Sequence, residues 1–197
     1  MDLELLEWLN TVTFPEEARY SDLNYAEKAY SIFADDLKKS ATTRASIFGT
    51  LHVDATELLM DLMEKTGLKA FIGKVNMDRN GSKALQEESA VVSATDTVRW
   101  LNDIAGKYEN VKPILTPRFT PSCSDELMSR LAEIQRAYCL PVQSHLSENK
   151  SEIAWVKELC PNTSFYGEAY YQFGLFGGKT CLGGFDWACV FKQPHLE

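Results

Sequence analysis

The feature that most constrains this chain is an alternation of short apolar runs with longer amphipathic segments. Short runs rich in β-branched and aromatic residues are typical of buried strands, and apolar residues at helical spacing indicate helices that cover a sheet. Their repeated alternation favours an α/β fold built from β-α units around a parallel sheet. The predicted strands are 45–51, 69–75, 111–116 and 140–145, and the predicted helices are 25–39, the segment between Asp54 and Gly67, 95–108, 124–138 and 151–159.

Several residues predict where these elements begin, end or bend. Asp54 and Glu57 have the spacing of a capping box, and Gly67 is placed to end the helix that follows them. Gly73 lies inside a strand pattern, where glycine usually permits a bend or a close approach of backbone. The polar stretch 76–88 is predicted to be a long loop, and loops after barrel strands are where function concentrates.

Four predicted strand–helix pairs are too few to close an eight-stranded barrel, which typically takes about 250 residues. An incomplete barrel leaves strand edges and apolar helix faces uncovered. We therefore expect either a self-sufficient open α/β sheet or part of a longer protein. The glycine-rich and aromatic end of the chain has no clean period, so we expect one domain over residues 1–180 and an atypical tail over 181–197.

Charge and composition exclude several functions. A formal charge of −8 and a pI near 5.0 provide no basic patch to neutralise phosphates, which argues against nucleic-acid and anionic-membrane binding. The acidic opening MDLELLEWLN is unlike a signal peptide, and no apolar run is long enough to span a bilayer. We therefore expect a cytoplasmic protein that acts on a neutral small molecule.

The segment PVQSHLSE, residues 141–148, carries the most informative chemical signal. His145 ends an apolar strand run, and the C-terminal ends of parallel strands face the active site, so its imidazole is placed to bind a metal ion. Glu148 follows three residues later, where a carboxylate can transfer protons beside a metal-activated water. The alternative is a solvated carboxylate at a helix start, which the helix dipole favours.

Arg118 and Phe119 follow the end of another predicted strand. A guanidinium beside an aromatic ring could hydrogen-bond the edge of a flat heterocycle and pack against its face. The alternative is a surface arginine next to a core phenylalanine.

Weaker candidates lie at other strand ends. A lone histidine such as His52 is more often structural than a metal ligand, and His195 lies near a chain end. Lys74, Asn76 and Asp78 could line the same face, but a solvated loop is the favoured interpretation.

Together these segments resemble the guanine deaminase family of the amidohydrolase superfamily. The resemblance rests on PILTPRFTPSCSDELM at 113–128, PVQSHLSENKSEIAWVK at 141–157 and GKVNMDRN at 73–80, and it extends over about residues 14–180. The paired PRF and SHLSEN motifs are far more specific together than either is alone. The resemblance implies a metal-dependent hydrolase of the TIM-barrel type, here a partial barrel of roughly four to five β-α units.

The resemblance also implies roles for individual residues. It makes His145 a ligand of one zinc ion and Glu148 the catalytic proton shuttle. Arg118 and Phe119 would hold the purine, and Leu146 and Ser147 would line the purine pocket beside His145 and Glu148. The implied reaction is hydrolysis of guanine to xanthine and ammonia.

The sequence also departs from that family. It contains no H-x-H pair, and Cys181 to Phe185 stands where the family has a further histidine. We therefore expect the remaining zinc ligands to be absent from this chain, as in a truncated or frame-shifted reading of a longer gene, and the chain alone to be inactive.

Two alternatives stay open at this point. Another deaminase or chlorohydrolase of the superfamily would share His145 and Glu148, and only Arg118 with Phe119 distinguishes it. A non-catalytic folded fragment would instead use its uncovered apolar faces for self-association. The expected ligand is guanine, and the sequence leaves a homodimer open as the oligomeric state.

Overall fold

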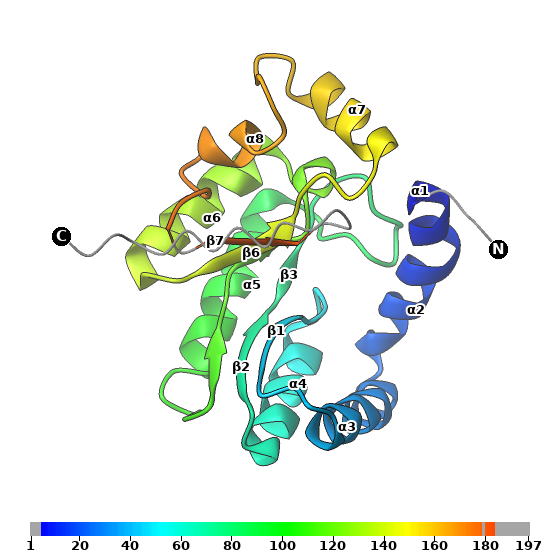
Figure 1. The fold of residues 1–197 in the computed structure, drawn as a ribbon, viewed down its shortest axis with the longest axis vertical. Helices are drawn as coiled ribbons and strands as arrows, with labels where there is room; N and C mark the ends of the chain where they lie inside the picture. The colour runs from blue at the N-terminus through cyan, green and yellow to red at the C-terminus, as the bar shows by residue number, and fades with distance from the viewer. Residues whose placement is uncertain (1–4, 179, 184–197) are drawn as a thin grey trace.

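The computed structural model describes residues 5–178 and 180–183, in which helices alternate with parallel strands (Figure 1). Short helices come first, followed by the strand–helix units. The helices are α1 (Leu5–Trp8), α2 (Phe14–Ala18), α3 (Leu23–Lys39), α4 (Val53–Thr66), α5 (Ala90–Asp103), α6 (Asp125–Tyr138), α7 (Lys150–Leu159) and α8 (Glu168–Tyr171), with shorter turns η1 (Leu9–Thr13), η2 (Arg19–Ser21) and η3 (Thr120–Ser122). The strands are β1 (Arg44–Phe48), β2 (Lys69–Gly73), β3 (Val75–Asn76), β4 (Val111–Pro113), β5 (Thr116–Pro117), β6 (Val142–His145) and β7 (Thr180–Gly183).

The strands follow one another across the fold in sequence order, and all their pairings are parallel. β1 pairs with β2 and β2 with β4, while their continuations β3 and β5 pair with each other. A parallel bridge between Leu115 and Val142 links this part to β6, which pairs with β7. Sequential parallel order with a helix after each strand is the arrangement of a β/α barrel, and the described strands do not close into one. The predicted partial barrel is confirmed.

Gln143 of β6 joins the two sides of the curved sheet. Its side-chain amide donates to the carbonyl of Ile47 in β1 at 3.0 Å and to Thr116 Oγ1 in β5 at 2.9 Å. Its Oε1 accepts from Ser46 Oγ at 2.6 Å. These bonds connect β6 to β1 and β5, and they are shielded from water because Gln143 is only 2% exposed.

The core lies between the strands and the apolar faces of the helices. Leu59 and Met63 of α4, Trp100 of α5 and Leu127 of α6 are each at most 1% exposed. Gly73 permits close approach of the neighbouring strand, because a β-carbon there would collide with Thr116 Oγ1. Gly67 ends α4 in the left-handed conformation, with φ of 76°, as predicted.

One local prediction is wrong. Asp54 is not the N-cap of α4, because the helix begins at Val53 and Asp54 lies within its first turn. The predicted long loop is present between β3 and α5, with Asn80, Lys83 and Gln86 exposed, but Met77, Leu85 and Glu87 within it are buried. Met77 and Leu85 form a second apolar cluster with Val75 and with Phe14 of α2. Hydrophobic contact with the N-terminal helices therefore orders a segment whose sequence is mostly polar.

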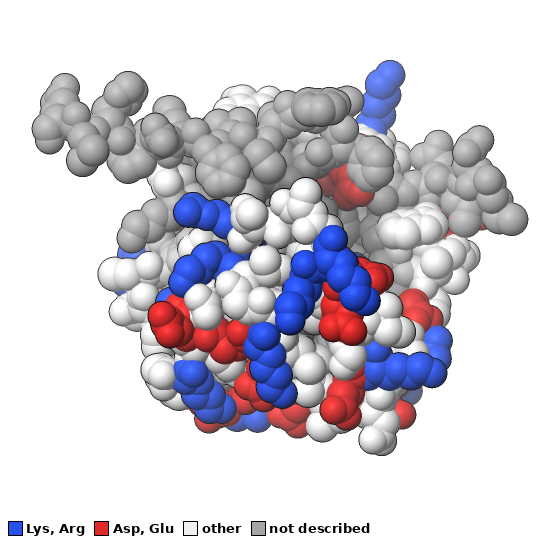
Figure 2. Space-filling model, turned by 60° about the horizontal axis from the view of Figure 1, so that its bottom comes forward, with Lys and Arg blue, Asp and Glu red and all other residues white. Residues whose placement is uncertain are grey.

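The outer surface mixes charges of both signs. Figure 2 shows Lys and Arg interspersed with Asp and Glu over the face seen there. An exposed pair such as Arg130 with Glu126 is typical of such a surface. Among the described residues, no helix is both long and apolar enough to cross a bilayer. β7 runs across the predicted boundary between residues 180 and 181 and pairs with β6, so the division into domain and tail stays a prediction. Residues 184–197, with His195, lie outside the described part.

Candidate active site

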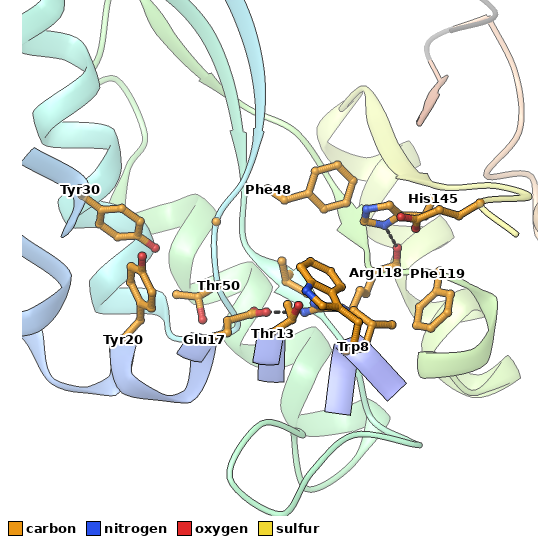
Figure 3. A pocket seen from close by; sticks show the side chains of 14 residues that line it. Trp8, Thr13, Glu17, Tyr20, Tyr30, Phe48, Thr50, Arg118, Phe119 and His145 are labelled. Carbon is orange, nitrogen blue, oxygen red and sulfur yellow. Dashed lines mark hydrogen bonds and ion pairs between the residues drawn. The ribbon is translucent and has the colours of Figure 1, made fainter. Parts of the chain in front are cut away.

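A pocket of about 430 Å³ lies at the C-terminal ends of the strands (Figure 3). On one side it is lined by Arg118 and Phe119 after β5 and by His145 and Glu148 at the end of β6. On the other side the N-terminal helices contribute Trp8, Leu9, Thr13 and Glu17. Four residues singled out in the sequence thus share one pocket, at the face where parallel α/β folds place their active sites.

His145 is held at one ring nitrogen by backbone. Its Nδ1 lies 2.8 Å from the carbonyl oxygen of Arg118, and its ring packs on Phe48 with centroids 4.5 Å apart. A carbonyl can only accept, so Nδ1 carries the hydrogen and Nε2 of the neutral ring carries the lone pair. Burial lowers the pKa of His145, with the Arg118 carbonyl and Glu148 acting in the opposite direction. A neutral imidazole anchored through Nδ1 is the form that binds metals through Nε2.

Tyr170 of α8 fixes the backbone on both sides of this bond. Its hydroxyl donates to the His145 carbonyl at 2.7 Å and accepts from the Thr120 N–H at 3.2 Å. Ser144 Oγ lies 2.9 Å from the same hydroxyl and 2.7 Å from the Pro117 carbonyl. Tyr170 is 1% exposed, so one buried hydroxyl joins the strand end that carries His145 to the segment that carries Arg118.

Glu148 is presented by a short turn between β6 and α7. Ser147 adopts a left-handed conformation with φ of 55°, which reverses the chain just before Glu148. The Glu148 N–H donates to Oε2 of Glu152 at 3.1 Å, and Asn149 caps α7 by accepting from the Glu152 N–H at 2.8 Å. Glu152 is fully buried, and burial raises its pKa. The turn is therefore fixed by its own helix cap, while the Glu148 side chain lines the pocket.

Arg118 is almost fully enclosed and paired with an acid from the N-terminal helices. Nη1 donates to Oε2 of Glu17 at 2.6 Å and lies 3.8 Å from the sulfur of Met77. The guanidinium carbon lies 4.9 Å from the ring centroid of Phe14. With only 10% of the Arg118 side chain and 14% of the Glu17 side chain exposed, this is a partly buried ion pair inside the pocket.

The other predicted pocket residues are placed differently. Phe119 is 5% exposed and meets Trp155 edge to face, with ring centroids 6.4 Å apart. Leu146 packs against the main core cluster, and the described pocket lining includes neither Leu146 nor Ser147. Their role in purine binding stays a prediction.

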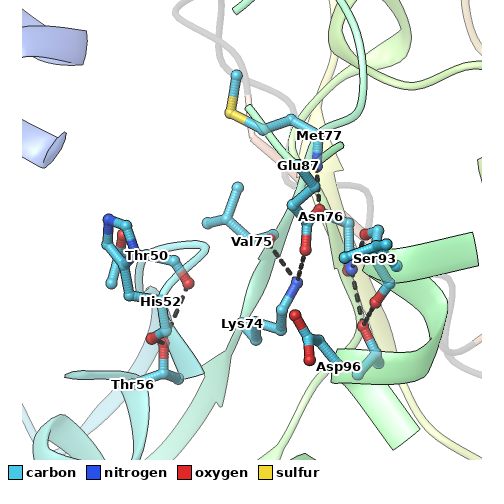
Figure 4. Close-up of polar contacts among 12 residues, drawn as sticks. Thr50, His52, Thr56, Lys74, Val75, Asn76, Met77, Glu87, Ser93 and Asp96 are labelled. Atoms are coloured by element: carbon cyan, nitrogen blue, oxygen red, sulfur yellow. Dashed lines mark hydrogen bonds and ion pairs between the residues drawn. The ribbon is translucent and has the colours of Figure 1, made fainter. Parts of the chain in front are cut away.

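Two of the weaker candidates, Lys74 and Asn76, are buried and take part in polar contacts inside the fold (Figure 4). Lys74 is 1% exposed and pairs with Glu87, whose Oε2 accepts from the Met77 N–H at 3.0 Å. The Asn76 amide donates to Ser93 and Thr97. The prediction that Lys74 and Asn76 lie in a solvated loop is therefore wrong, because both have partners inside the fold.

His52 and Asp78 have structural surroundings. His52 lies outside the pocket lining, with Nε2 buried and without a hydrogen-bond partner among the described residues, and burial lowers its pKa. Asp78 accepts from the Ser124 N–H at 2.7 Å at the start of α6. Within residues 5–178 and 180–183, no group of three or more His, Cys, Asp or Glu side chains could hold a metal ion.

Sequence analysis missed the groups that come from outside the strand ends. Glu17 and Phe14 contact Arg118 from α2, and Tyr170 holds the His145 backbone from α8. The segment FPEE carried a signal that could have been used, because proline near a helix start followed by acids predicts a short capped helix. No local pattern indicates that this helix would pack on Arg118.

The sheet order and the pocket at its C-terminal edge are those of a partial β/α barrel enzyme domain. The chain belongs to the amidohydrolase family, whose model matches residues 1–183. Within that family it is similar to guanine deaminases. It is 42% identical to that of Mus musculus over 198 residues and 38% identical to that of Escherichia coli over 199 residues. A crystal structure of guanine deaminase from C. acetobutylicum with bound guanine superimposes with a TM-score of 0.89 at 49% identity over 92% of this chain.

The match covers only part of each relative. The chain spans 43% of the Mus musculus protein, 42% of the Escherichia coli protein and 43% of the C. acetobutylicum chain. A zinc-bound adenosine deaminase from Xanthomonas campestris has a TM-score of 0.71 at 16% identity, which shows the shared fold alone.

Proposed function

We propose that this chain carries the purine-holding and proton-transferring part of a guanine deaminase site, and that the protein hydrolyses guanine to xanthine and ammonia. The proposal rests on one observation: a single pocket is lined by His145, Glu148, Arg118 and Phe119. Similarity to guanine deaminases over the whole chain supports the choice of substrate.

Each residue has a distinct task in this proposal. Arg118 donates hydrogen bonds to the acceptor edge of the purine, and Phe119 packs against the ring system, so the pair orients the substrate. Glu148 takes a proton from the attacking water and delivers it to a ring nitrogen as the water oxygen bonds to the amino-bearing carbon. The second proton of that water then passes to the amino group, which leaves as ammonia when its bond to carbon breaks. The turn fixed by Asn149 and Glu152 keeps the carboxylate in the pocket.

We further propose zinc as the metal, with His145 as the ligand supplied by the described residues. The fit rests on the bond between Nδ1 and the Arg118 carbonyl, which leaves the Nε2 lone pair for a metal. When bound, zinc lowers the pKa of a coordinated water toward about 7. We also propose a cytoplasmic location and a free purine rather than a nucleic acid as ligand, which the net charge of −8 favours.

Guanine binding by the 197-residue chain tests the proposed pocket. Saturation-transfer NMR should detect bound guanine with the native chain, and Arg118→Gln should weaken binding at least tenfold because it removes a charged donor. Arg130→Gln is the matched control, because Arg130 is an exposed arginine paired with Glu126 on α6. Absence of guanine binding by the native chain, or equal binding by Arg118→Gln, contradicts the proposed pocket.

Turnover should behave differently from binding. We expect no xanthine from guanine with added zinc, because a catalytic zinc generally takes about three protein ligands and the described residues contain no group of three that could hold a metal ion. Rapid xanthine formation by this chain would show that the ligand count is wrong.

A further inference from the structure

The ion pair between Glu17 and Arg118 has a consequence for which ligands the pocket accepts. Both side chains line the pocket, and the hydrogen bond of 2.6 Å places opposite charges in direct contact with little solvent around them. Attraction between charges at this distance is strong when water is largely excluded. Glu17 therefore cancels most of the field that Arg118 would otherwise project into the cavity.

The other residues around Arg118 add no positive charge that would attract an anion into the pocket. Phe14 and Met77 are apolar or weakly polar, and Glu148 adds a further negative charge to the pocket lining. The guanidinium has five N–H donors, and its hydrogen bonds to the described residues all leave from Nη1. Arg118 thus keeps donors for a neutral acceptor while its charge is already balanced.

Glu17 also offers an acceptor. Its Oε1 is buried and has no hydrogen-bond partner among the described residues. A buried carboxylate oxygen beside a guanidinium matches a ligand edge that presents an N–H next to a carbonyl oxygen, as in an oxopurine. A phosphate group in the pocket would instead be repelled, because the carboxylates of Glu17 and Glu148 are also negatively charged.

We propose that Glu17 is a specificity-determining residue: by neutralising Arg118 it makes the pocket select the neutral oxopurine base and exclude phosphorylated forms of that base. This inference rests on the proposed function for the identity of the base. The exclusion of anions rests on the ion pair alone.

The test compares anion binding by three forms of the full 197-residue chain at low ionic strength. Calorimetry with guanosine monophosphate and with inorganic phosphate should detect no saturable binding by the native chain. Glu17→Gln, which keeps the size of the side chain and removes its charge, should bind both anions at least tenfold more tightly than the native chain. Adding Arg118→Gln to that variant should abolish the gain.

Glu148→Gln is the matched control, because it removes a carboxylate from the same pocket without uncovering Arg118. It should raise phosphate affinity much less than Glu17→Gln does, because it removes one repelling charge but leaves Arg118 paired with Glu17. An equal gain in Glu148→Gln, or no gain in a folded Glu17→Gln chain, overturns the inference. Thermal melting reports whether each variant is folded, and Glu17→Met replaces Glu17→Gln if the latter does not fold.

Guanine binding, measured on the same samples, separates this inference from the proposed function. If the native chain fails to bind guanine while Glu17→Gln gains phosphate binding, the proposed substrate is wrong and the charge-masking role of Glu17 stands. If guanine binds equally well to the native chain and to Glu17→Gln, and phosphate binds to neither, the proposed function survives and the inference fails.

Discussion

At the scale of single residues, the site depends on buried polar atoms that tie neighbouring strand ends together. His145 and Arg118 were singled out because each follows an apolar strand run. Their relative orientation comes from the bond between His145 Nδ1 and the Arg118 carbonyl and from the hydroxyl of Tyr170. Neither contact has a signature in the sequence, since one uses backbone and the other uses a tyrosine 25 positions away along the chain.

Tyr170→Phe should therefore destabilise the chain without changing its shape. It removes one hydroxyl and leaves the Thr120 N–H and the His145 carbonyl without their partner. Buried groups left unpaired cost about 1–3 kcal/mol, so urea unfolding should show a loss of that order. Tyr171→Phe is the control, because Tyr171 is 66% exposed and should change stability by less than about 0.5 kcal/mol. Equal stability of the Tyr170→Phe and native chains would show that the hydroxyl contributes nothing.

At the scale of elements, the strand–helix units were predictable and the connections between them were not. Helical periodicity gave α6 to within one residue, and Ser124 caps it by accepting from the Leu127 N–H. The segment after β3 forms the predicted loop, but its partial burial was not predicted: Glu87 pairs with Lys74, which precedes β3, and Met77 and Leu85 lie in one apolar cluster with Phe14. The burial of these side chains depends on contacts with residues distant in sequence, so a local sequence pattern does not predict it.

Removing one member of the buried pair should be costly. Lys74→Met leaves the Glu87 carboxylate buried and unpaired, and such losses are typically about 3–5 kcal/mol, measured by urea unfolding. Adding Glu87→Gln should recover part of the loss, because glutamine removes the charge and can still accept from the Met77 N–H. Arg130→Met is the control, because its pair with Glu126 is exposed and should contribute at most about 1 kcal/mol. A loss in Lys74→Met no larger than in this control would contradict the assigned role.

At the scale of the whole molecule, a partly closed sheet needs internal ties. Gln143 provides one, because it bonds to Ser46 and Ile47 of β1 and to Thr116 of β5 from the middle of β6. These residues lie far apart in sequence, so the bonds hold the sheet in the curvature that brings the strand ends around the pocket.

Gln143→Leu should weaken this curvature. The substitution keeps the volume and leaves Ser46 Oγ, the Ile47 carbonyl and Thr116 Oγ1 without this partner. We expect a loss of at least about 2 kcal/mol in urea unfolding, since each buried unpaired group costs about 1–3 kcal/mol. Amide hydrogen exchange in β1 should become faster. Gln172→Leu, at an exposed position, is the control, and unchanged exchange in Gln143→Leu would contradict the proposed tie.

The sequence by itself determined the alternation of strands and helices, their parallel order and the placement of His145, Glu148, Arg118 and Phe119 near strand ends. These features follow from local periodicity, which acts over a few residues. Other contacts became visible only in the folded chain: Glu17 pairs with Arg118, Tyr170 joins two strand ends, and Met77, Leu85 and Glu87 are buried within a mostly polar loop. Those contacts join residues distant in sequence, and their stability comes from excluding water between surfaces that form only when the chain has folded.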